Sequence, residues 1–126
     1  ARGYGLADDT GQIENTADTR FFLGSVTKEF TATAILLLQQ EGKLQVQNLL
    51  CTYLVACSDA WQSITVKEVL MHTSGIPGEG DVQLPDDTPE NWIAAMASQP
   101  LEFAPGTQFD YCSVCYQVLA YEAKWF

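Results

Sequence analysis

A serine and a lysine stand three positions apart in "GSVTKEF", residues 24–30, directly ahead of the most apolar run of the sequence. On a helix, positions i and i+3 share a face, so the Ser25 hydroxyl can meet the Lys28 amine. The N–H groups of a first helical turn favour an oxyanion, and a desolvated lysine can accept the serine proton. The pattern fits an activated nucleophile, although a capping serine beside a solvated lysine fits it as well.

The helix that must position this pair is predicted over residues 26–40. Apolar residues recur near the helical period of 3.6, and Gly42 with Lys43 marks the end. Because residues 35–38 are all apolar, the helix is apolar nearly all round, and we expect it to be buried in the middle of a domain.

Three further helices are predicted downstream. The first spans residues 65–75, with a capping box between Thr65 and Glu68 and Gly75 as its end. The second spans residues 89–99 with a proline in its first turn, and the third begins at Cys112. Residues 2–8 and 19–25 are predicted to be extended, and the Pro-, Gly- and Asp-rich residues 76–91 to form a surface loop at the rim of a site.

Composition limits the class of protein. The 126 residues fit one domain, and 47% apolar residues suffice for a hydrophobic core. The formal charge of −10 would repel nucleic acids and anionic lipids, so neither is an expected partner. The longest apolar stretch, residues 34–38, is far shorter than a membrane span. Both ends of the sequence are predicted to be cut from a longer protein, because each lacks the usual start or stop signals.

The four cysteines form two pairs in the sequence, Cys51 with Cys57 and Cys112 with Cys115. A zinc site of four thiolates is one interpretation. Free buried thiols are the default expectation, and an even number also permits disulfides. The acidic residues 79–87 are expected to form a solvated rim rather than a calcium site, because their carboxylates lack the spacing of a calcium loop.

His72 is the only histidine of the sequence, so no second histidine is at hand as a base for Ser25. We expect it to be structural, near the C-terminal end of a helix where its positive charge is favourable.

Three blocks of the sequence together resemble the serine β-lactamase-related family, which includes class C β-lactamases, D-alanyl-D-alanine carboxypeptidases and related esterases. The blocks are "FFLGSVTKEFTATAILLLQQEGKL", "ITVKEVLMHTSGIPG" and "FAPGTQFDYCSVCYQVLAY". The resemblance extends over residues 3–121. It implies an α+β chain of the β-lactamase/transpeptidase-like fold, represented mainly by its helical part with one or two strands of the sheet, and hence a single incomplete domain over residues 1–126.

The resemblance also implies the site residues. The family's acylated serine falls on Ser25, the lysine that activates it on Lys28, and the tyrosine that shares the acid and base work on Tyr111. The block "HTSG" is expected to shape the rim of the site, and the Ser25 N–H to be one oxyanion donor.

Two departures from the family pattern bear on activity. The pattern Tyr-x-Asn is "YCS" in this chain, so Ser113 stands at the asparagine position and offers one hydroxyl in place of an amide for binding substrate. The third motif, Lys-Thr-Gly or His-x-Gly, does not occur in the 126 residues. We therefore expect residues 1–126 alone to be inactive.

The leading hypothesis is a serine hydrolase that cleaves amide or ester bonds through an acyl-serine, on a small-molecule or peptide substrate and without a metal or organic cofactor. The alternatives are a non-catalytic relative that serves as a binding or scaffold module, and a thiol metal-binding domain. The resemblance leans toward a periplasmic or secreted protein. The sequence leaves the substrate and the oligomeric state open.

Overall fold

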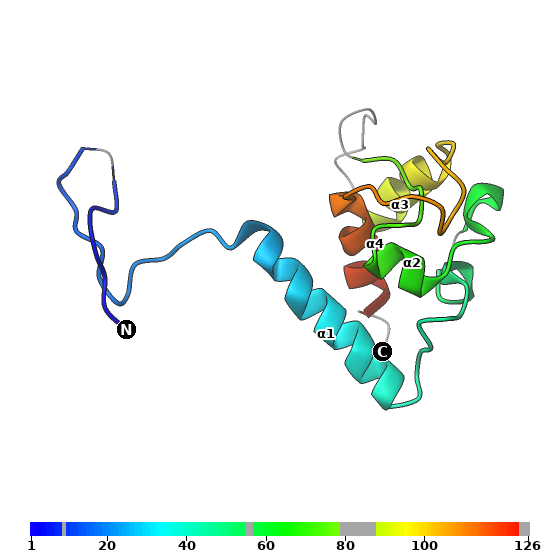
Figure 1. The fold of residues 1–126 in the computed structure, drawn as a ribbon, viewed down its shortest axis with the longest axis horizontal. Coiled ribbons are helices and arrows are strands. Elements are labelled where there is room, and N and C mark those ends of the chain that lie inside the picture. Colours follow the sequence, from blue (N-terminus) through cyan, green and yellow to red (C-terminus); the bar gives the residue numbers. More distant parts are fainter. Residues whose placement is uncertain (9, 55–56, 79–87, 124–126) are drawn as a thin grey trace.

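A computed structural model of the chain describes residues 1–8, 10–54, 57–78 and 88–123. Within these ranges the helices are α1 (Thr27–Gln40), α2 (Val66–Leu70), α3 (Pro89–Ala97) and α4 (Ser113–Ala123), with short 3₁₀ turns at η1 (Gly24–Val26), η2 (Leu50–Thr52) and η3 (Asp59–Trp61). The helices α2, α3 and α4 gather in one cluster, α1 runs beside it, and the residues before α1 reach away from it (Figure 1). As expected, the chain is mainly helical.

The core is built around α4, which packs against both α1 and α2. Its side chains Val114, Val118 and Leu119 are fully buried, as is Cys115. Large side chains from the other segments close around it, namely Ile35, Leu44, Leu50, Trp61, Ile64, Val66, Val69, Ile76 and Met96. Burial of this apolar surface stabilises the cluster at about 25 cal/mol for each Å² removed from water.

The prediction that α1 is buried nearly all round is wrong for the described residues. Only Ile35 is buried among its side chains, while Phe30 is 66% exposed and both Leu36 and Leu37 are 52% exposed. The physical reason is that α4 covers one face of α1 and no other described helix packs against it closely. The predicted bounds of the helix agree with the structure to within one residue.

Helix α2 begins as predicted, but it ends five residues earlier. The Thr65 hydroxyl accepts from the Glu68 N–H, and the Glu68 carboxylate accepts from the Thr65 N–H, which is a capping box. The helix then stops at Leu70, and His72, with φ of 57°, takes the left-handed position that follows it. Gly75 was therefore the wrong residue for the end of this helix.

Helix α3 is confirmed close to its predicted bounds. Thr88 caps it by accepting from the Asn91 N–H, and Pro89 lies in its first turn, where the missing N–H costs nothing. Of the predicted surface loop, residues 79–87 lie outside the described residues, and with them the acidic rim.

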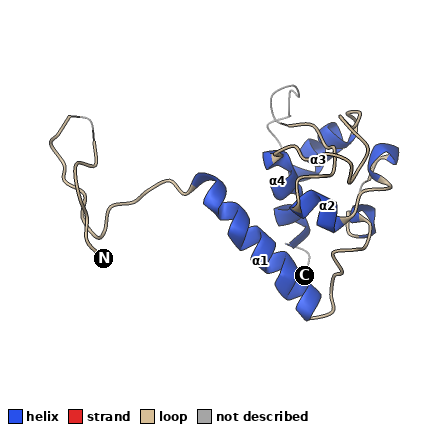
Figure 2. Ribbon diagram, in the orientation of Figure 1, coloured by secondary structure: helices blue, strands red, loops and turns tan. Residues whose placement is uncertain are grey.

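Extended structure is limited to bridges in the described part of the chain. Leu6 pairs with Glu14 across a turn, and Leu49 pairs with Thr65. Figure 2 accordingly shows helices and loops but no strand. The strand expected over residues 2–8 is thus reduced to a single bridge, because an isolated hairpin with no third strand to pair with is only marginally stable.

The expectation of free thiols is wrong. Cys51 and Cys57 form one disulfide and Cys112 and Cys115 form another, with Cα atoms 5.5 Å and 5.3 Å apart, within the range that a disulfide spans. Each pair is close in the chain, and a local turn brings its sulfurs together. The four thiolates that a zinc site would need are therefore engaged in two separate bonds. In the described ranges, no three His, Cys, Asp or Glu side chains form a group that could hold a metal ion.

None of the helices within the described ranges is long and apolar enough to cross a membrane.

Candidate active site

Ser25 and Lys28 meet at the start of α1. Ser25 lies in η1 and Lys28 in the first turn of the helix, with the Lys28 Nζ donating to the Ser25 Oγ over 3.5 Å. The N-cap of α1 is Val26, and no side chain caps the helix. Ser25 therefore does not cap α1, and the alternative interpretation of it as a capping serine is wrong.

Tyr111 reaches the same serine from a segment 86 residues away. Its hydroxyl donates to the Ser25 Oγ over 2.6 Å, and the Lys28 Nζ lies 4.9 Å from the centre of its ring. Hydrogen bonding to Lys28, then to Ser25, lowers the pKa of Tyr111 below its ordinary value, and the positive charge of Lys28 adds to this effect. The phenolate, which could accept a proton from Ser25, is thus favoured.

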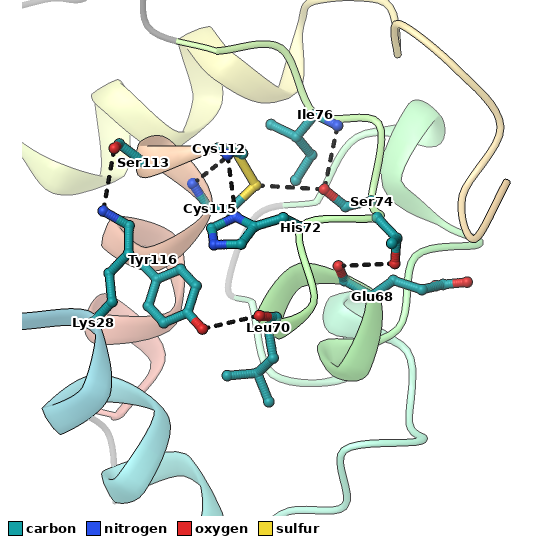
Figure 3. The surroundings of a disulfide bond; sticks show 11 residues. Lys28, Glu68, Leu70, His72, Ser74, Ile76, Cys112, Ser113, Cys115 and Tyr116 are labelled. Atoms are coloured by element: carbon teal, nitrogen blue, oxygen red, sulfur yellow. Dashed lines mark hydrogen bonds between the residues drawn. A yellow bond between two sulfur atoms is a disulfide. The ribbon is translucent and has the colours of Figure 1, made fainter. Parts of the chain in front are cut away.

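Ser113 completes the group. It is the first residue of α4, and its Oγ accepts from the Lys28 Nζ over 3.2 Å (Figure 3). The serine therefore makes the contact with lysine despite being shorter than asparagine, because α4 packs directly against α1. A hydrogen bond between Ser113 and Tyr111 also contributes to the lowered pKa of Tyr111. The structure brings together all four residues that the sequence singled out.

Two segments distant in the sequence pair to deliver Tyr111. The N–H groups of Glu102, Gly106 and Asp110 donate to the carbonyls of Gly75, Thr73 and His72, over 2.8, 2.8 and 2.9 Å respectively. Residues 102–110 are therefore held by backbone hydrogen bonds to the block "HTSG", residues 72–75. This agrees with the structural part that the sequence indicated for it.

Gly75 lies at the tightest point of this pairing. Its φ is 77°, and a Cβ added there would lie 2.2 Å from the Phe103 carbonyl oxygen, a backbone atom that cannot turn away. We expect Gly75→Ala to lower the free energy of unfolding by about 2 kcal/mol or more, because strain and a backbone clash act together. Urea unfolding of the full-length protein measures this change. Gly78→Ala is the matched control, since a Cβ there meets nothing within 4 Å. Equal midpoints for the two variants would contradict the prediction.

An open groove of about 480 Å³ runs beside three of the four residues, between the start of α1 and α4. Ser25, Lys28 and Ser113 line it, together with Tyr116 and Phe22. An acyl group held in this groove would contact the serine oxygen, hydrogen-bonding side chains and aromatic rings.

His72 lies beside the site, as expected for the first residue of the block "HTSG", but the sequence did not indicate its contacts with Tyr111 and Cys112. Its Nδ1 accepts from the Cys112 N–H, and its ring faces the ring of Tyr111. Burial, then the charge of Lys28, lowers the pKa of His72, so the expectation of a favourable positive charge was wrong. The dipole of α2, a single short helix, is outweighed by desolvation and a nearby cation.

Comparison with known proteins identifies relatives over nearly the whole chain. The family model described as Beta-lactamase matches residues 1–123. The Bacillus subtilis (strain 168) "Putative penicillin-binding protein PbpX" is 41% identical over 122 residues, which make up 95% of this chain and 30% of that protein.

Solved structures give the same result. A penicillin-binding protein homologue from Pyrococcus abyssi, described as octameric, is 29% identical with a TM-score of 0.77, over 98% of this chain and 31% of that one. A β-lactamase/D-alanine carboxypeptidase from Pseudomonas syringae is 27% identical with a TM-score of 0.75, over 96% and 35%. The chain thus has the fold expected from its sequence and spans about a third of the length of these relatives.

Proposed function

Because the chain belongs to the Beta-lactamase family, we propose that it forms part of a serine hydrolase that cleaves amide or ester bonds through an acyl-Ser25 intermediate. The observation that carries the proposal is the 2.6 Å hydrogen bond between Tyr111 and Ser25 with Lys28 beside both. Residues 1–126 are one incomplete domain in this proposal, in keeping with the third of its relatives' length that the chain spans.

In the proposed reaction, the Ser25 Oγ bonds to the carbonyl carbon and its proton passes to the Tyr111 oxygen. The hydrogen bonds and charge of Lys28 favour the phenolate that accepts this proton. The Lys28 Nζ donates to both Ser25 and Ser113 and so holds these two side chains in place, while its positive charge stabilises the Tyr111 phenolate. Tyr111 then returns the proton to the leaving amine or alcohol, and water releases the acyl group by the reverse proton path.

The Ser25 N–H, at the start of a helix, is the proposed oxyanion donor of this chain. Ser113 is the proposed substrate-binding residue, since it lines the groove beside Ser25 and carries a hydroxyl that can bind a polar group of the substrate. A second oxyanion donor would come from the family's third motif, which residues 1–126 do not contain. Residues 1–126 alone are therefore proposed to be inactive.

The substrate class follows from what the relatives are named for. Two of them carry penicillin-binding in their names and one is described as a β-lactamase and D-alanine carboxypeptidase. We propose a β-lactam, a D-Ala-D-Ala peptide or an ester as the substrate. The two disulfides are typical of oxidising compartments and support a periplasmic or secreted location.

Covalent labelling tests the proposed function. The full-length protein would be treated with a fluorescent penicillin and, separately, with a fluorescent fluorophosphonate, and labelled protein would be counted against total protein. The proposal expects close to one label per chain from at least one probe. If a folded protein takes neither label, the non-catalytic binding module becomes the better hypothesis.

Tyr111→Phe tests the proposed proton acceptor. The variant keeps the ring beside His72 and removes only the hydroxyl that reaches Ser25. We expect the rate constant for acylation to fall about 10²-fold, within the usual range for loss of a general base. Stopped-flow labelling measures it.

Tyr116→Phe is the matched control for this variant. Its ring also faces His72 and Lys28, but its hydroxyl donates to the Leu70 carbonyl over 2.9 Å. A similar loss of rate in both variants would contradict a specific role of the Tyr111 hydroxyl in acylation.

A further inference from the structure

His72 has a backbone conformation that its residue type disfavours. Among the described residues it is the one non-glycine with positive φ, at 57°. It follows α2 at the position where glycine is usual: the His72 N–H donates to the Val69 carbonyl and the Thr73 N–H to the Glu68 carbonyl, which closes the helix end. A glycine would adopt this conformation without cost. Closing the end of α2 therefore does not explain why this position carries an imidazole side chain.

The side chain and the carbonyl of His72 accept hydrogen bonds from the residues on both sides of Tyr111. The His72 carbonyl accepts from the Asp110 N–H over 2.9 Å, and its Nδ1 accepts from the Cys112 N–H over 3.1 Å. Between these two bonds, the ring centres of His72 and Tyr111 lie 4.7 Å apart. Phe109 meets the same imidazole edge-on at 5.9 Å. Figure 3 shows the imidazole pointing at the Cys112 amide, beside the disulfide.

We infer that His72 is a positioning residue for Tyr111, holding the Tyr111 hydroxyl at Ser25 by accepting the Cys112 N–H on an unprotonated Nδ1. The inference rests on the proposed function, since it explains how the proposed proton acceptor is held at the nucleophile. Tyr111 itself is 48% exposed and has no burial to fix its place. The hydrogen bonds that the Asp110 and Cys112 N–H groups donate to His72 restrain it instead.

This hydrogen bond depends on the protonation state of His72. A protonated ring carries a hydrogen on Nδ1 and cannot accept from Cys112. The charged and titratable groups that face the ring are Lys28 from α1, Asp110 and Tyr111 from the adjoining segment, and Tyr116 from α4.

Burial, then the Lys28 charge, lowers the pKa of His72, while the contact with the Cys112 backbone and the Asp110 carboxylate act in the opposite direction and are outweighed. The neutral ring therefore prevails at neutral pH. Positioning is expected to be lost as the pH falls through this lowered pKa, which lies below the ordinary value of about 6.5.

Two variants separate the hydrogen bond from the backbone. His72→Gly fits the left-handed conformation and removes the acceptor. His72→Asn tolerates that conformation and places an amide oxygen near the position of Nδ1, but it does not titrate. Acylation of the full-length protein would be timed with a fluorophosphonate, which has no ionisable group of its own near neutral pH.

We expect His72→Gly to be acylated about tenfold more slowly than the wild type at pH 7.5 and His72→Asn to stay within about threefold, because small misplacements of a catalytic group are costly. The wild-type rate should fall at acid pH with a midpoint equal to the His72 titration midpoint measured by NMR. The part of the fall that follows the His72 titration should be absent in His72→Asn, which keeps only the pH dependence of Tyr111 ionisation.

The outcomes distinguish the inference from the proposed function. A wild type that takes no label overturns both. Normal labelling of the wild type with an unchanged rate in His72→Gly, or an equal loss in the Gly and Asn variants, overturns the positioning role alone. The Cys112 amide gives a readout that needs no activity: its NMR shift should follow the His72 titration, and a shift that ignores it overturns the hydrogen bond.

Discussion

Ser25→Ala is expected to abolish covalent labelling by both probes and to lower turnover of any substrate about 10⁴-fold or more. The reason is that the variant removes the oxygen that accepts from both Lys28 and Tyr111, and loss of a nucleophile removes the entire covalent route. Fluorescent labelling followed over hours, and turnover under saturating substrate, measure the two effects.

Ser63→Ala is the control for this variant. Ser63 is exposed and lies outside the groove beside Ser25. It should leave both labelling and turnover at the wild-type level. Because Ser25 is also exposed, its variant should unfold at the same urea concentration as the wild type. Labelling that persists in a folded Ser25→Ala protein would mean that another side chain is acylated.

Lys28→Met has the second-largest expected effect, a fall of about 10³-fold in the rate constant for acylation, near the middle of the range for acid and base catalysis. The methionine keeps much of the length of the side chain and removes its charge and its donors. The bonds from Lys28 to Ser25 and Ser113 are lost together. The pKa of Tyr111 should also rise toward its ordinary value, because Lys28 is the first cause of its lowering.

Two measurements check the Lys28 prediction. Stopped-flow labelling gives the rate constant, and ultraviolet difference titration follows ionisation of the tyrosines. Lys67→Met is the matched control, since Lys67 is exposed on α2 and makes no contact with the site. A Lys28 variant that is acylated as fast as the Lys67 variant would remove Lys28 from the proposed mechanism.

The sequence predicted the parts of the fold that local signals determine. The capping box at Thr65, the Pro89 start of α3 and the period of α1 depend on residues within one or two helical turns, and each appears in the structure. The left-handed residue after α2 was missed, because the rule prefers glycine and the structure uses His72 there. That departure is the observation from which the positioning role of His72 is inferred.

The extent of burial could not be predicted, because it depends on which segments pack against a helix and not on the helix itself. The sequence of helix α1 is apolar nearly all round, yet α4 covers only one of its faces and Phe30 stays exposed. The cysteine state was missed for a related reason. The spacing of Cys112 and Cys115 fits a metal knuckle, a free pair or a disulfide, and only the turn at the start of α4 selects among them.

The candidate site was predicted residue by residue through resemblance, while its geometry was not. Ser25 and Lys28 are neighbours on one helix, so their contact follows from spacing. Tyr111 and Ser113 arrive through the pairing of residues 72–75 with 102–110, a contact between distant segments that no local pattern reveals. The sequence placed His72 at the rim within the block "HTSG", but its contacts with Cys112 and Tyr111 depend on that same pairing.

The most direct measurement is the mass and position of the adduct that a penicillin or a fluorophosphonate leaves on the full-length protein. Intact mass spectrometry gives the number of adducts, and fragmentation of the proteolytic peptide that spans residues 21–28 gives the residue. We predict one adduct per chain, on the Ser25 oxygen. An adduct on any other residue, or a folded protein that carries none, would contradict the assignment of Ser25 as the nucleophile.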